Sequence, residues 1–322
     1  MKLPIVDQGD LKNKRVFVRG DIDVPLAPFD DTRLKDIWPT VEYLLKQDCT
    51  ILLGGHLGRP GGKEDLSLSS KPVAQWMATR LRQGSGEVNG VCLKGKICGF
   101  VVTEKLIVLE NLRFDSREEV NDPDYSKELA SLAEVYVNES FGESHREVAS
   151  IVGVPKLLPH YAGFRLVKEV EVLSGVLRAP KRPLVVVIGG AKIETKQPVI
   201  EKMRGFADSV FVGGKLLGRE QNDMPEEEIL GWQEKIAAAQ TIIWNGPVGK
   251  VEEITYQVGT RKLAELITNN SMAYKIVGGG DTVAFLDKLG LTGKFDWVSS
   301  GGGSMLKLLA GEKLPGIEVL LT

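Results

Sequence analysis

The sequence predicts an α/β protein with two doubly wound domains, each built on a parallel sheet and joined to the other by a helix. Three observations support this. Short runs of aliphatic residues alternate with longer helical patterns, which is typical of buried parallel strands connected by helices. The chain has 322 residues, more than the roughly 250–300 that one hydrophobic core usually serves. An amphipathic pattern at Phe164–Leu177, followed by Pro180 and Pro183, separates the alternating segments into two groups.

Strands are expected wherever a short, continuous run of β-branched and aliphatic residues occurs, because strands buried on both faces carry few polar positions. Four such runs precede the dividing helix and five follow it. The expected strands are Val16–Val18, Thr50–Leu53, Leu106–Leu109, Val135–Val137, Leu184–Ile188, Ser209–Val212, Thr241–Trp244, Lys275–Val277 and Trp297–Val298.

Helices are expected between these strands, where apolar residues recur at helical spacing. Pro39 and Pro198 are interpreted as the first residues of two of them, because proline suits the first turn of a helix. The expected helices are Pro39–Gln47, Lys71–Leu81, Ser126–Leu132, Phe164–Leu177, Pro198–Phe206, Glu226–Gln240, Arg261–Ile267, Thr282–Leu289 and Ser304–Leu309.

Composition excludes several functional classes. Lys plus Arg total 41 and Asp plus Glu total 43, a net charge of −2, so no basic field favours nucleic acid or an anionic membrane. No secretory signal and no apolar run near the ~20 residues of a membrane span is present. The odd, sparse count of cysteines, without CxxC or zinc spacing, fits a reducing compartment. We therefore expect a cytoplasmic protein without nucleic-acid or membrane partners, and a monomer, since no exposed apolar stripe demands a second chain.

Glycine follows nearly every expected strand of the second half. The loops are Gly189-Gly190, Gly213-Gly214, Gly246 to Gly249, Gly278–Gly280 and Gly301–Gly303. Ligands of open α/β sheets bind beyond the carboxyl ends of the strands, where glycine lets backbone N–H groups approach phosphate. One such loop could be an ordinary turn, but five along one edge predict a nucleotide site.

Charged residues near these loops fit the same interpretation. Lys192 and Lys196 can neutralise phosphate, and Asp281 can hold Mg²⁺ or, alternatively, cap a helix. No GxGxxG fingerprint is present. The segment Gly90–Lys96 matches GxxxxGK, but Ile97 replaces the required Ser or Thr and no strand precedes it, so we interpret it as a false match.

In the first half, cationic side chains follow the expected strands. Each alone has an ordinary interpretation as a solvated or ion-paired group. Their shared position at the carboxyl edge of one sheet predicts instead a cup for a small polyanion, held by bidentate hydrogen bonds. The charged residues of this edge are Asp21, Asp23, Arg33, His56, Arg59, Arg113, His145 and Arg146. His160, near a proline, is expected to be structural.

A nucleotide site on one domain and an anion site on the other together predict phosphoryl transfer. The domains should then close about the linking helix to exclude water. No Ser-His-Asp arrangement is evident, and an acceptor that is a carboxylate or phosphate is already ionised at neutral pH and needs no general base.

The segments that carry these residues resemble, in order, the motifs of phosphoglycerate kinases, and the resemblance covers nearly the whole chain. The segments are Arg19–Leu26, Asp31–Arg33, Gly55–Pro60, Leu109–Phe114, Tyr136–Gly142 with His145-Arg146, Gly189–Lys192, Trp244–Gly249, Gly278–Thr282, Ser300–Gly303 and Leu314–Gly316.

The resemblance implies reversible phosphoryl transfer between 1,3-bisphosphoglycerate and ADP, giving 3-phosphoglycerate and MgATP. It places the transferring phosphoryl group near Arg33, Lys192, Lys196, Gly279 and Gly302. The phosphoglycerate site would comprise Asp21, Asp23, Arg33, His56, Arg59, Arg113 and Arg146. The nucleotide site would comprise Gly189, Lys192, Lys196, Gly213, Asn245, Pro247, Glu252, Gly279, Gly280, Asp281 and Thr282, with Mg²⁺ on Asp281. The implied domains are 1–162 for phosphoglycerate, 163–180 for the linking helix, 181–304 for nucleotide, and 305–322 as a segment returning to the first domain.

Two departures from the family pattern have consequences. The chain is shorter than family members usually are, and the loss falls between Val212 and Thr241, which predicts a reduced second domain with a shallower adenine pocket. Asp23 stands where the family has asparagine, and its carboxylate should repel an anionic substrate unless an arginine pairs with it or it is protonated. Besides an active, shortened kinase, two hypotheses therefore stay open: a catalytically weak relative that binds a phosphorylated metabolite or a protein partner, and a phosphotransferase with another acceptor.

Overall fold

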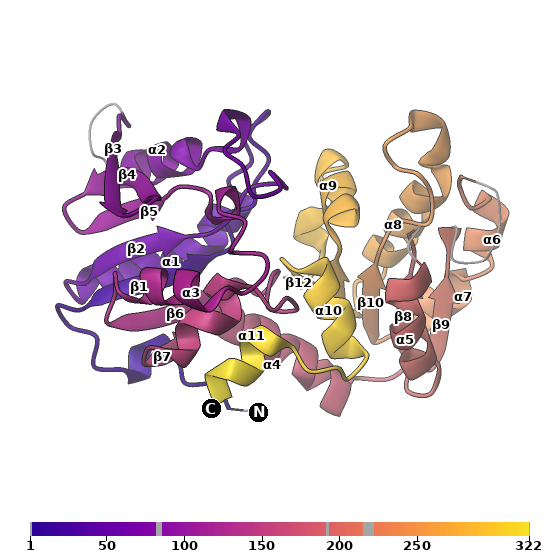
Figure 1. Ribbon diagram of the computed structural model, residues 1–322. Coiled ribbons are helices and arrows are strands. Elements are labelled where there is room, and N and C mark those ends of the chain that lie inside the picture. Colours follow the sequence, from indigo (N-terminus) through magenta and orange to yellow (C-terminus); the bar gives the residue numbers. More distant parts are fainter. Residues whose placement is uncertain (1, 82–85, 191–192, 215–221, 322) are drawn as a thin grey trace. The chain divides into compact units, whose positions relative to one another are not determined.

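The computed structural model describes residues 2–81, 86–190, 193–214 and 222–321, and the chain divides into two compact units (Figure 1). Unit 1 comprises Met1–Glu169 and Leu314–Thr322, and unit 2 comprises Val170–Lys313. The division falls within helix α4 (Phe164–Arg178), the helix expected to link the domains. In the described part of the chain, no helix has both the length and the apolar character needed to cross a membrane.

Unit 1 contains a seven-stranded sheet with the order β3-β4-β5-β2-β1-β6-β7. Its strands are β1 (Arg15–Gly20), β2 (Thr50–Gly54), β3 (Asn89–Lys94), β4 (Ile97–Thr103), β5 (Leu106–Leu109), β6 (Val135–Glu139) and β7 (His160–Ala162). The pairs among β5, β2, β1, β6 and β7 are parallel. Val18 lies opposite both Leu53 and Val137, so β1, β2 and β6 end at the same edge.

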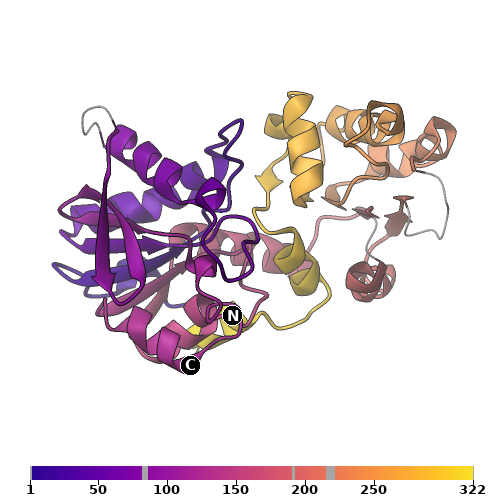
Figure 2. The same cartoon turned by 45° about the horizontal axis from the view of Figure 1, so that its top comes forward.

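The hairpin of β3 and β4 at the edge of this sheet (Figure 2) was not predicted, because exposed positions in β3 interrupt the apolar pattern. It explains the false nucleotide motif: Gly90–Lys96 is a hairpin strand and turn, with Gly95 at φ +54°. Cys92 lies opposite Cys98 across the hairpin, and the two form a disulfide, while Cys49 is free and buried. The interpretation of the cysteines as sparse thiols of a reducing compartment did not anticipate this pair, because antiparallel pairing was not foreseen here.

The helices within unit 1 are α1 (Thr32–Lys46), α2 (Lys71–Arg80), α3 (Pro123–Ala130) and α11 (Pro315–Glu318). The expectation that Pro39 begins a helix is wrong, because α1 starts at Thr32 and contains Pro39. The turns before the proline are stabilised by burial of Leu34, Ile37 and Trp38, which offsets the single hydrogen bond that proline cannot donate. Pro198 likewise lies inside its helix, α5 (Ile193–Arg204) of unit 2.

Unit 2 contains a five-stranded parallel sheet with the order β12-β11-β10-β8-β9. Its strands are β8 (Leu184–Ile188), β9 (Ser209–Val212), β10 (Thr241–Asn245), β11 (Tyr274–Gly278) and β12 (Trp297–Val298). Asn245 lies opposite both Ile188 and Gly278, so the glycine loops that follow β8, β10 and β11 start at one edge. The parallel sheets that the aliphatic runs predicted are therefore present in both units.

The remaining helices of unit 2 are α6 (Glu226–Leu230), α7 (Gln233–Ala238), α8 (Val258–Asn269), α9 (Gly280–Lys288) and α10 (Gly302–Leu309). The single helix expected over Glu226–Gln240 is interrupted at Gly231, which separates α6 from α7. The core of this unit surrounds the fully buried Trp244, whose indole N–H donates to the Gly246 carbonyl.

Candidate active site

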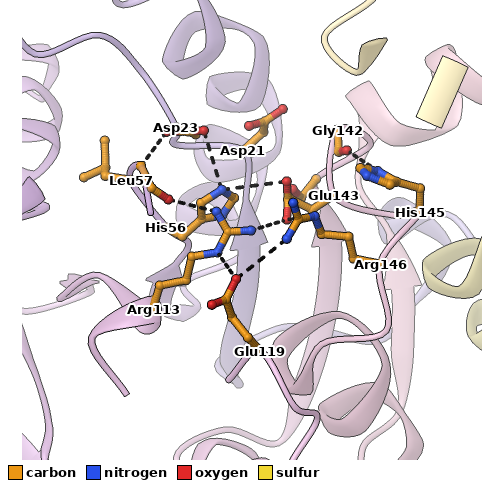
Figure 3. Close-up of polar contacts among 12 residues, drawn as sticks. Asp21, Asp23, His56, Leu57, Arg113, Glu119, Gly142, Glu143, His145 and Arg146 are labelled. Carbon is orange, nitrogen blue, oxygen red and sulfur yellow. Dashed lines mark hydrogen bonds and ion pairs between the residues drawn. The ribbon is translucent and has the colours of Figure 1, made fainter. Parts of the chain in front are cut away.

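Charged side chains gather at the carboxyl edge of the unit 1 sheet (Figure 3). Asp21 and Asp23 follow β1, His56 follows β2, and Arg146 follows β6. The aligned ends of these parallel strands explain why residues far apart in sequence meet, as the sequence analysis expected. Their partners decide what the cluster can bind.

His56 lies at the centre of the cluster, with only 3% of its surface exposed. Its Nδ1 lies 3.1 Å from Nη2 of the buried Arg19. Because a guanidinium can only donate, Nδ1 accepts and Nε2 carries the proton. Nε2 faces the carboxylates of Asp23, at 3.6 Å, and Glu143, at 3.7 Å. Burial lowers the pKa of His56 despite these carboxylates, so the imidazole is neutral and offers one N–H donor.

Arg113 and Arg146 are held by two carboxylates that the sequence analysis did not single out. Arg113 Nη2 donates to Glu143 Oε2 at 2.9 Å, and its Nε lies 3.5 Å from Glu119 Oε1. Arg146 Nε lies 3.4 Å from Glu143 Oε2, and its Nη1 lies 3.7 Å from Glu119 Oε1. Arg113 Nη1 also donates to the Gly58 carbonyl at 2.9 Å. Both arginines are thus oriented into the cluster by ion pairs.

Arg33 pairs with Asp21, its Nη1 donating to Oδ1 at 2.6 Å. The neighbouring charge of Asp21 raises the pKa of Arg33. No hydrogen bond from the described residues reaches the other carboxylate oxygen of Asp21, Oδ2, although it is buried. A buried acceptor without a donor favours a ligand hydroxyl or N–H at this point.

Asp23, the departure from the family pattern, is ionised. Burial acts to raise its pKa, but His56, the Gly58 N–H at 2.9 Å and the charge of Arg33 together hold that pKa well below its usual range. The sequence analysis expected either an arginine partner or protonation to relieve the repulsion; the structure instead places His56 and the Gly58 N–H beside an ionised Asp23. Its negative charge persists in the site.

Two of the predicted residues differ in their surroundings from the others. Arg59 is exposed, and no contact to the cluster is found for it within the described ranges. His145 directs its Nδ1 to the Gly142 carbonyl at 2.8 Å. His160, expected to be structural, has its Nδ1 2.8 Å from the Pro155 carbonyl.

The pattern of cations beyond the strand ends does not include Arg19, Glu119 or Glu143. Arg19 lies inside β1, where its side chain is almost fully buried. Glu143 could have been found from its spacing of three residues before Arg146, which brings the two side chains together.

In unit 2, a cavity of about 410 Å³ lies where β10 and β11 end. Eight of the residues predicted to bind nucleotide line it: Lys196, Asn245, Pro247, Glu252, Gly279, Gly280, Asp281 and Thr282. It is also lined by Gly190, Gly214, Gly246 and Gly249, which belong to the predicted glycine loops, and by Asn222 and Lys250, which were not predicted.

The glycine loops around this cavity pack directly on one another. Gly246 has φ +94°, and a side chain there would collide with the Gly189 carbonyl and with Lys196. A Cβ on Gly302 would lie 2.9 Å from the Cα of Gly279. Close approach of backbones therefore explains part of the glycine array without a ligand. Gly213 is likewise buried beside Met224, and Lys192 lies outside the described residues.

Lys196 is the one predicted cation whose environment in unit 2 is described. Its Nζ donates to the Gly189 carbonyl, and burial lowers its pKa to about 8, while Asp281 acts in the opposite direction. Asp281 occupies the first turn of α9. No group of three or more metal-ligating side chains occurs in the parts of the chain that the structure describes. A single carboxylate beside phosphates still fits Mg²⁺, which commonly takes one or two carboxylates plus phosphate oxygens.

A wider cavity of about 1220 Å³ lies between the β3–β4 hairpin and residues 110–117. It includes none of the predicted substrate residues. Its arginine, Arg117, is already paired with Asp115 at 2.8 Å and Glu128 at 3.0 Å. Volume alone therefore does not identify the site, and the charged cluster at the strand ends carries the chemistry.

Comparison with known proteins identifies consistent relatives. A family model described as phosphoglycerate kinase matches the chain in two pieces, residues 6–219 and 217–312. A phosphoglycerate kinase of Dictyoglomus turgidum is 35% identical, and the match covers 97% of this chain and 96% of that protein. The chloroplastic phosphoglycerate kinase of Volvox carteri is 34% identical, covering 97% of this chain and 84% of its own length.

Solved structures agree in fold. The phosphoglycerate kinase from Coxiella burnetii has a TM-score of 0.80 at 28% identity, covering 99% of both chains. That from Pyrococcus horikoshii has a TM-score of 0.82 at 24% identity, which speaks for the fold alone.

The comparisons also locate the shortening. The alignment with the Dictyoglomus protein extends over 383 positions, more than the 322 residues of this chain. That relative therefore has segments without a counterpart here. The two pieces matched by the family model meet at residues 217–219, inside the interval between Val212 and Thr241 where the sequence analysis places the loss.

Proposed function

The chain belongs to the phosphoglycerate kinase family, and we propose that unit 1 binds the phosphoglycerate and unit 2 binds the nucleotide. It is a phosphotransferase, and the family's reaction moves a phosphoryl group between 1,3-bisphosphoglycerate and ADP, giving 3-phosphoglycerate and MgATP. Membership over nearly the whole chain favours this enzyme over a catalytically weak binding relative.

The observation that carries the assignment of unit 1 is the charged cluster at its strand ends. Arg33, Arg113 and Arg146 supply positive charge, and neutral His56 supplies a directed N–H. A substrate with one phosphate and one carboxylate would be held at both ends by such groups. Asp21 Oδ2 would accept a hydrogen bond from the substrate hydroxyl, which satisfies its missing donor.

In unit 2, the proposed nucleotide site is the cavity at the strand ends. Lys196 would neutralise the transferring group, and Lys192 would join it. The backbone N–H groups of the loops at Gly279 and Gly302 would face the phosphates, while Pro247, Asn245 and Glu252 would border the nucleoside. When bound, Mg²⁺ would offset phosphate charge, and Asp281 would hold it.

The chemical step needs only positioning and charge neutralisation, because the acceptor carboxylate is ionised at neutral pH. Since the two substrates bind to different units, transfer requires the units to close, and we propose α4 as the hinge helix. Its first turn is anchored within unit 1: Glu139 accepts from the N–H groups of Arg165, at 3.1 Å, and Leu166, at 3.0 Å. Thr40 Oγ1 accepts from the N–H of Phe164 at 3.0 Å. We further propose a monomeric, cytoplasmic enzyme.

A coupled assay tests the proposal. Purified protein is given 3-phosphoglycerate and MgATP, and the 1,3-bisphosphoglycerate formed is coupled to NADH oxidation. Lys196→Ala should lower turnover by about 100-fold or more, the usual effect of removing one preorganised charge-stabilising group. Lys202→Ala, an exposed lysine on the same helix, should retain activity. Equal activity in the Lys196 variant, or none in folded wild-type protein, would contradict the proposal.

A further inference from the structure

Glu143 occupies the point in the unit 1 cluster where an anionic ligand would be expected. Figure 3 shows its carboxylate between His56 and the two arginines. Oε2 lies 2.9 Å from Arg113 Nη2 and 3.4 Å from Arg146 Nε, and Oε1 lies 3.7 Å from His56 Nε2. These three partners are all residues that the sequence analysis assigned to the substrate anion.

We propose that Glu143 is an internal competitor of the substrate: its carboxylate fills the anion position and must leave it before an anionic group binds. This inference rests on the proposed phosphoglycerate site in unit 1. It makes Glu143 a residue that determines the affinity of the site for anions.

Glu143 is charged where it lies. Burial acts to raise its pKa, but the charges of Arg19, Arg113 and Arg146 together lower that pKa below its ordinary value. A phosphate or carboxylate placed on Arg113 and Arg146 would therefore meet a second negative charge at contact distance. Like charges at that separation repel strongly in a site largely shielded from water.

Groups besides Glu143 also orient the two arginines. Glu119 contacts both, at 3.5 Å from Arg113 Nε and 3.7 Å from Arg146 Nη1. Arg113 is held further by the Gly58 carbonyl. If the Glu143 carboxylate turns away, the cations stay in place and face the substrate.

The backbone around Glu143 can also stay fixed while its side chain turns. The N–H of Ser144 donates to the Phe141 carbonyl at 3.1 Å, and the N–H of Arg146 donates to the Glu143 carbonyl at 2.9 Å. The side chain is 14% exposed, so it has a route toward water.

Competition with a tethered group lowers the affinity of the site for anions. A carboxylate attached to the loop has a high effective concentration at the arginines. Every anion that binds at Arg113 and Arg146 must displace it, so the carboxylate lowers the affinity for inorganic phosphate and for 3-phosphoglycerate by about the same factor.

The test measures binding of inorganic phosphate and of 3-phosphoglycerate by calorimetry at low ionic strength. Glu143→Gln removes the charge but keeps the side-chain size. We expect this variant to bind phosphate and 3-phosphoglycerate each about tenfold more tightly than wild type. Glu143→Asp keeps the charge on a shorter chain and should lie between the two. Glu147→Gln removes an exposed charge from the same loop and should bind both anions as wild type does.

The sign of the change separates competition from a structural role. If Glu143 only positioned the arginines, its removal would weaken anion binding, and unchanged or weaker phosphate binding in Glu143→Gln, with an unaltered melting temperature, would overturn the proposal. Should Glu143→Gln fail to fold, the same comparison is made with Glu143→Asp, for which tighter binding than wild type is required. Wild-type protein that binds these anions but gives no turnover would refute the proposed kinase activity and leave the competition measurable.

Discussion

The pKa of Lys196 makes nucleotide binding dependent on pH in a direction that can be worked out. Burial lowers this pKa to about 8 in the free protein. Phosphate oxygens placed beside the ammonium would restore it toward the ordinary value near 10.4. The charged form therefore prevails in the complex at pH 9, but not in the free protein. Binding at high pH must then include uptake of a proton.

The magnitude follows from the fraction of charged lysine. With a pKa of about 8, the charged fraction falls from about nine-tenths at pH 7 to about one-tenth at pH 9. The dissociation constant of ADP should rise about tenfold over that interval, which corresponds to about 1.4 kcal/mol. The last ionisation of a phosphate group has a pKa of about 6, so ADP is almost fully ionised from pH 7 to 9 and contributes little to this change.

Isothermal titration of ADP into the protein at pH 7, 8 and 9 measures the effect. Lys196→Arg keeps a permanent charge at the same position, so its dissociation constant should not change over this range. Lys202→Ala should reproduce the wild-type rise. A flat wild-type profile, or the same rise in Lys196→Arg, would refute the argument that desolvation of Lys196 controls binding.

Three further predictions concern other parts of the molecule. Burial raises the pKa of Glu139 to about 7, so between about pH 4.5 and 7 the folded protein binds a proton that the unfolded chain does not. The free energy of unfolding of wild type, measured in urea, should therefore fall by about 3 kcal/mol relative to that of Glu139→Gln as pH rises through this range. Parallel pH profiles of the two proteins would contradict this. Asp23→Asn removes a negative charge from the anion site, while the side-chain oxygen can still accept a hydrogen bond from the Gly58 N–H. Calorimetry should show that the variant binds 3-phosphoglycerate about three- to tenfold more tightly than wild type. Unchanged affinity would refute a repulsive role of Asp23. The buried Asn270 amide donates to the carbonyls of Ile236 and Ala239, at 2.8 and 2.9 Å. Asn270→Ala should therefore lower the free energy of unfolding by about 2–4 kcal/mol. A loss below about 0.5 kcal/mol, the usual size for a surface substitution, would show that water replaces these hydrogen bonds.

The sequence predicted the sheets well because nearly all parallel strands in both units are continuous apolar runs. It missed β3, whose residues alternate between exposed and half-buried, its antiparallel partner β4 (Ile97–Thr103), and β7, which is only three residues long. It placed the starts of α1 and α5 too late, because proline was assumed to begin a helix. In α1 the burial of Leu34, Ile37 and Trp38 before the proline, which only the folded structure shows, outweighs the local preference of proline.

The candidate site was predicted through the common edge of the parallel strands, which brings Asp21, His56 and Arg113 together. Its charge balance was not predicted. The carboxylates of Glu119 and Glu143 both pair with the arginines of the cluster. No spacing in the sequence indicates that Glu119, which lies in a separate loop, reaches Arg113 and Arg146. The cations alone predict a positively charged site that is open to an anion. In the structure these cations are already paired with carboxylates, and an anionic substrate must rearrange those ion pairs.

The ionisation states in this cluster support a mechanism without a general base. The pKa of His56 is lowered by burial, that of Asp23 is held low by His56 and Gly58 against the effect of burial, and that of Arg33 is raised by Asp21. Each shift moves the pKa of its group further from pH 7. Acid–base catalysis requires the opposite, a pKa drawn toward the working pH. A cluster of fixed charges and one neutral imidazole can orient an anion and neutralise its charge. An acceptor that is already ionised needs no group to remove a proton, so orientation and charge neutralisation are sufficient.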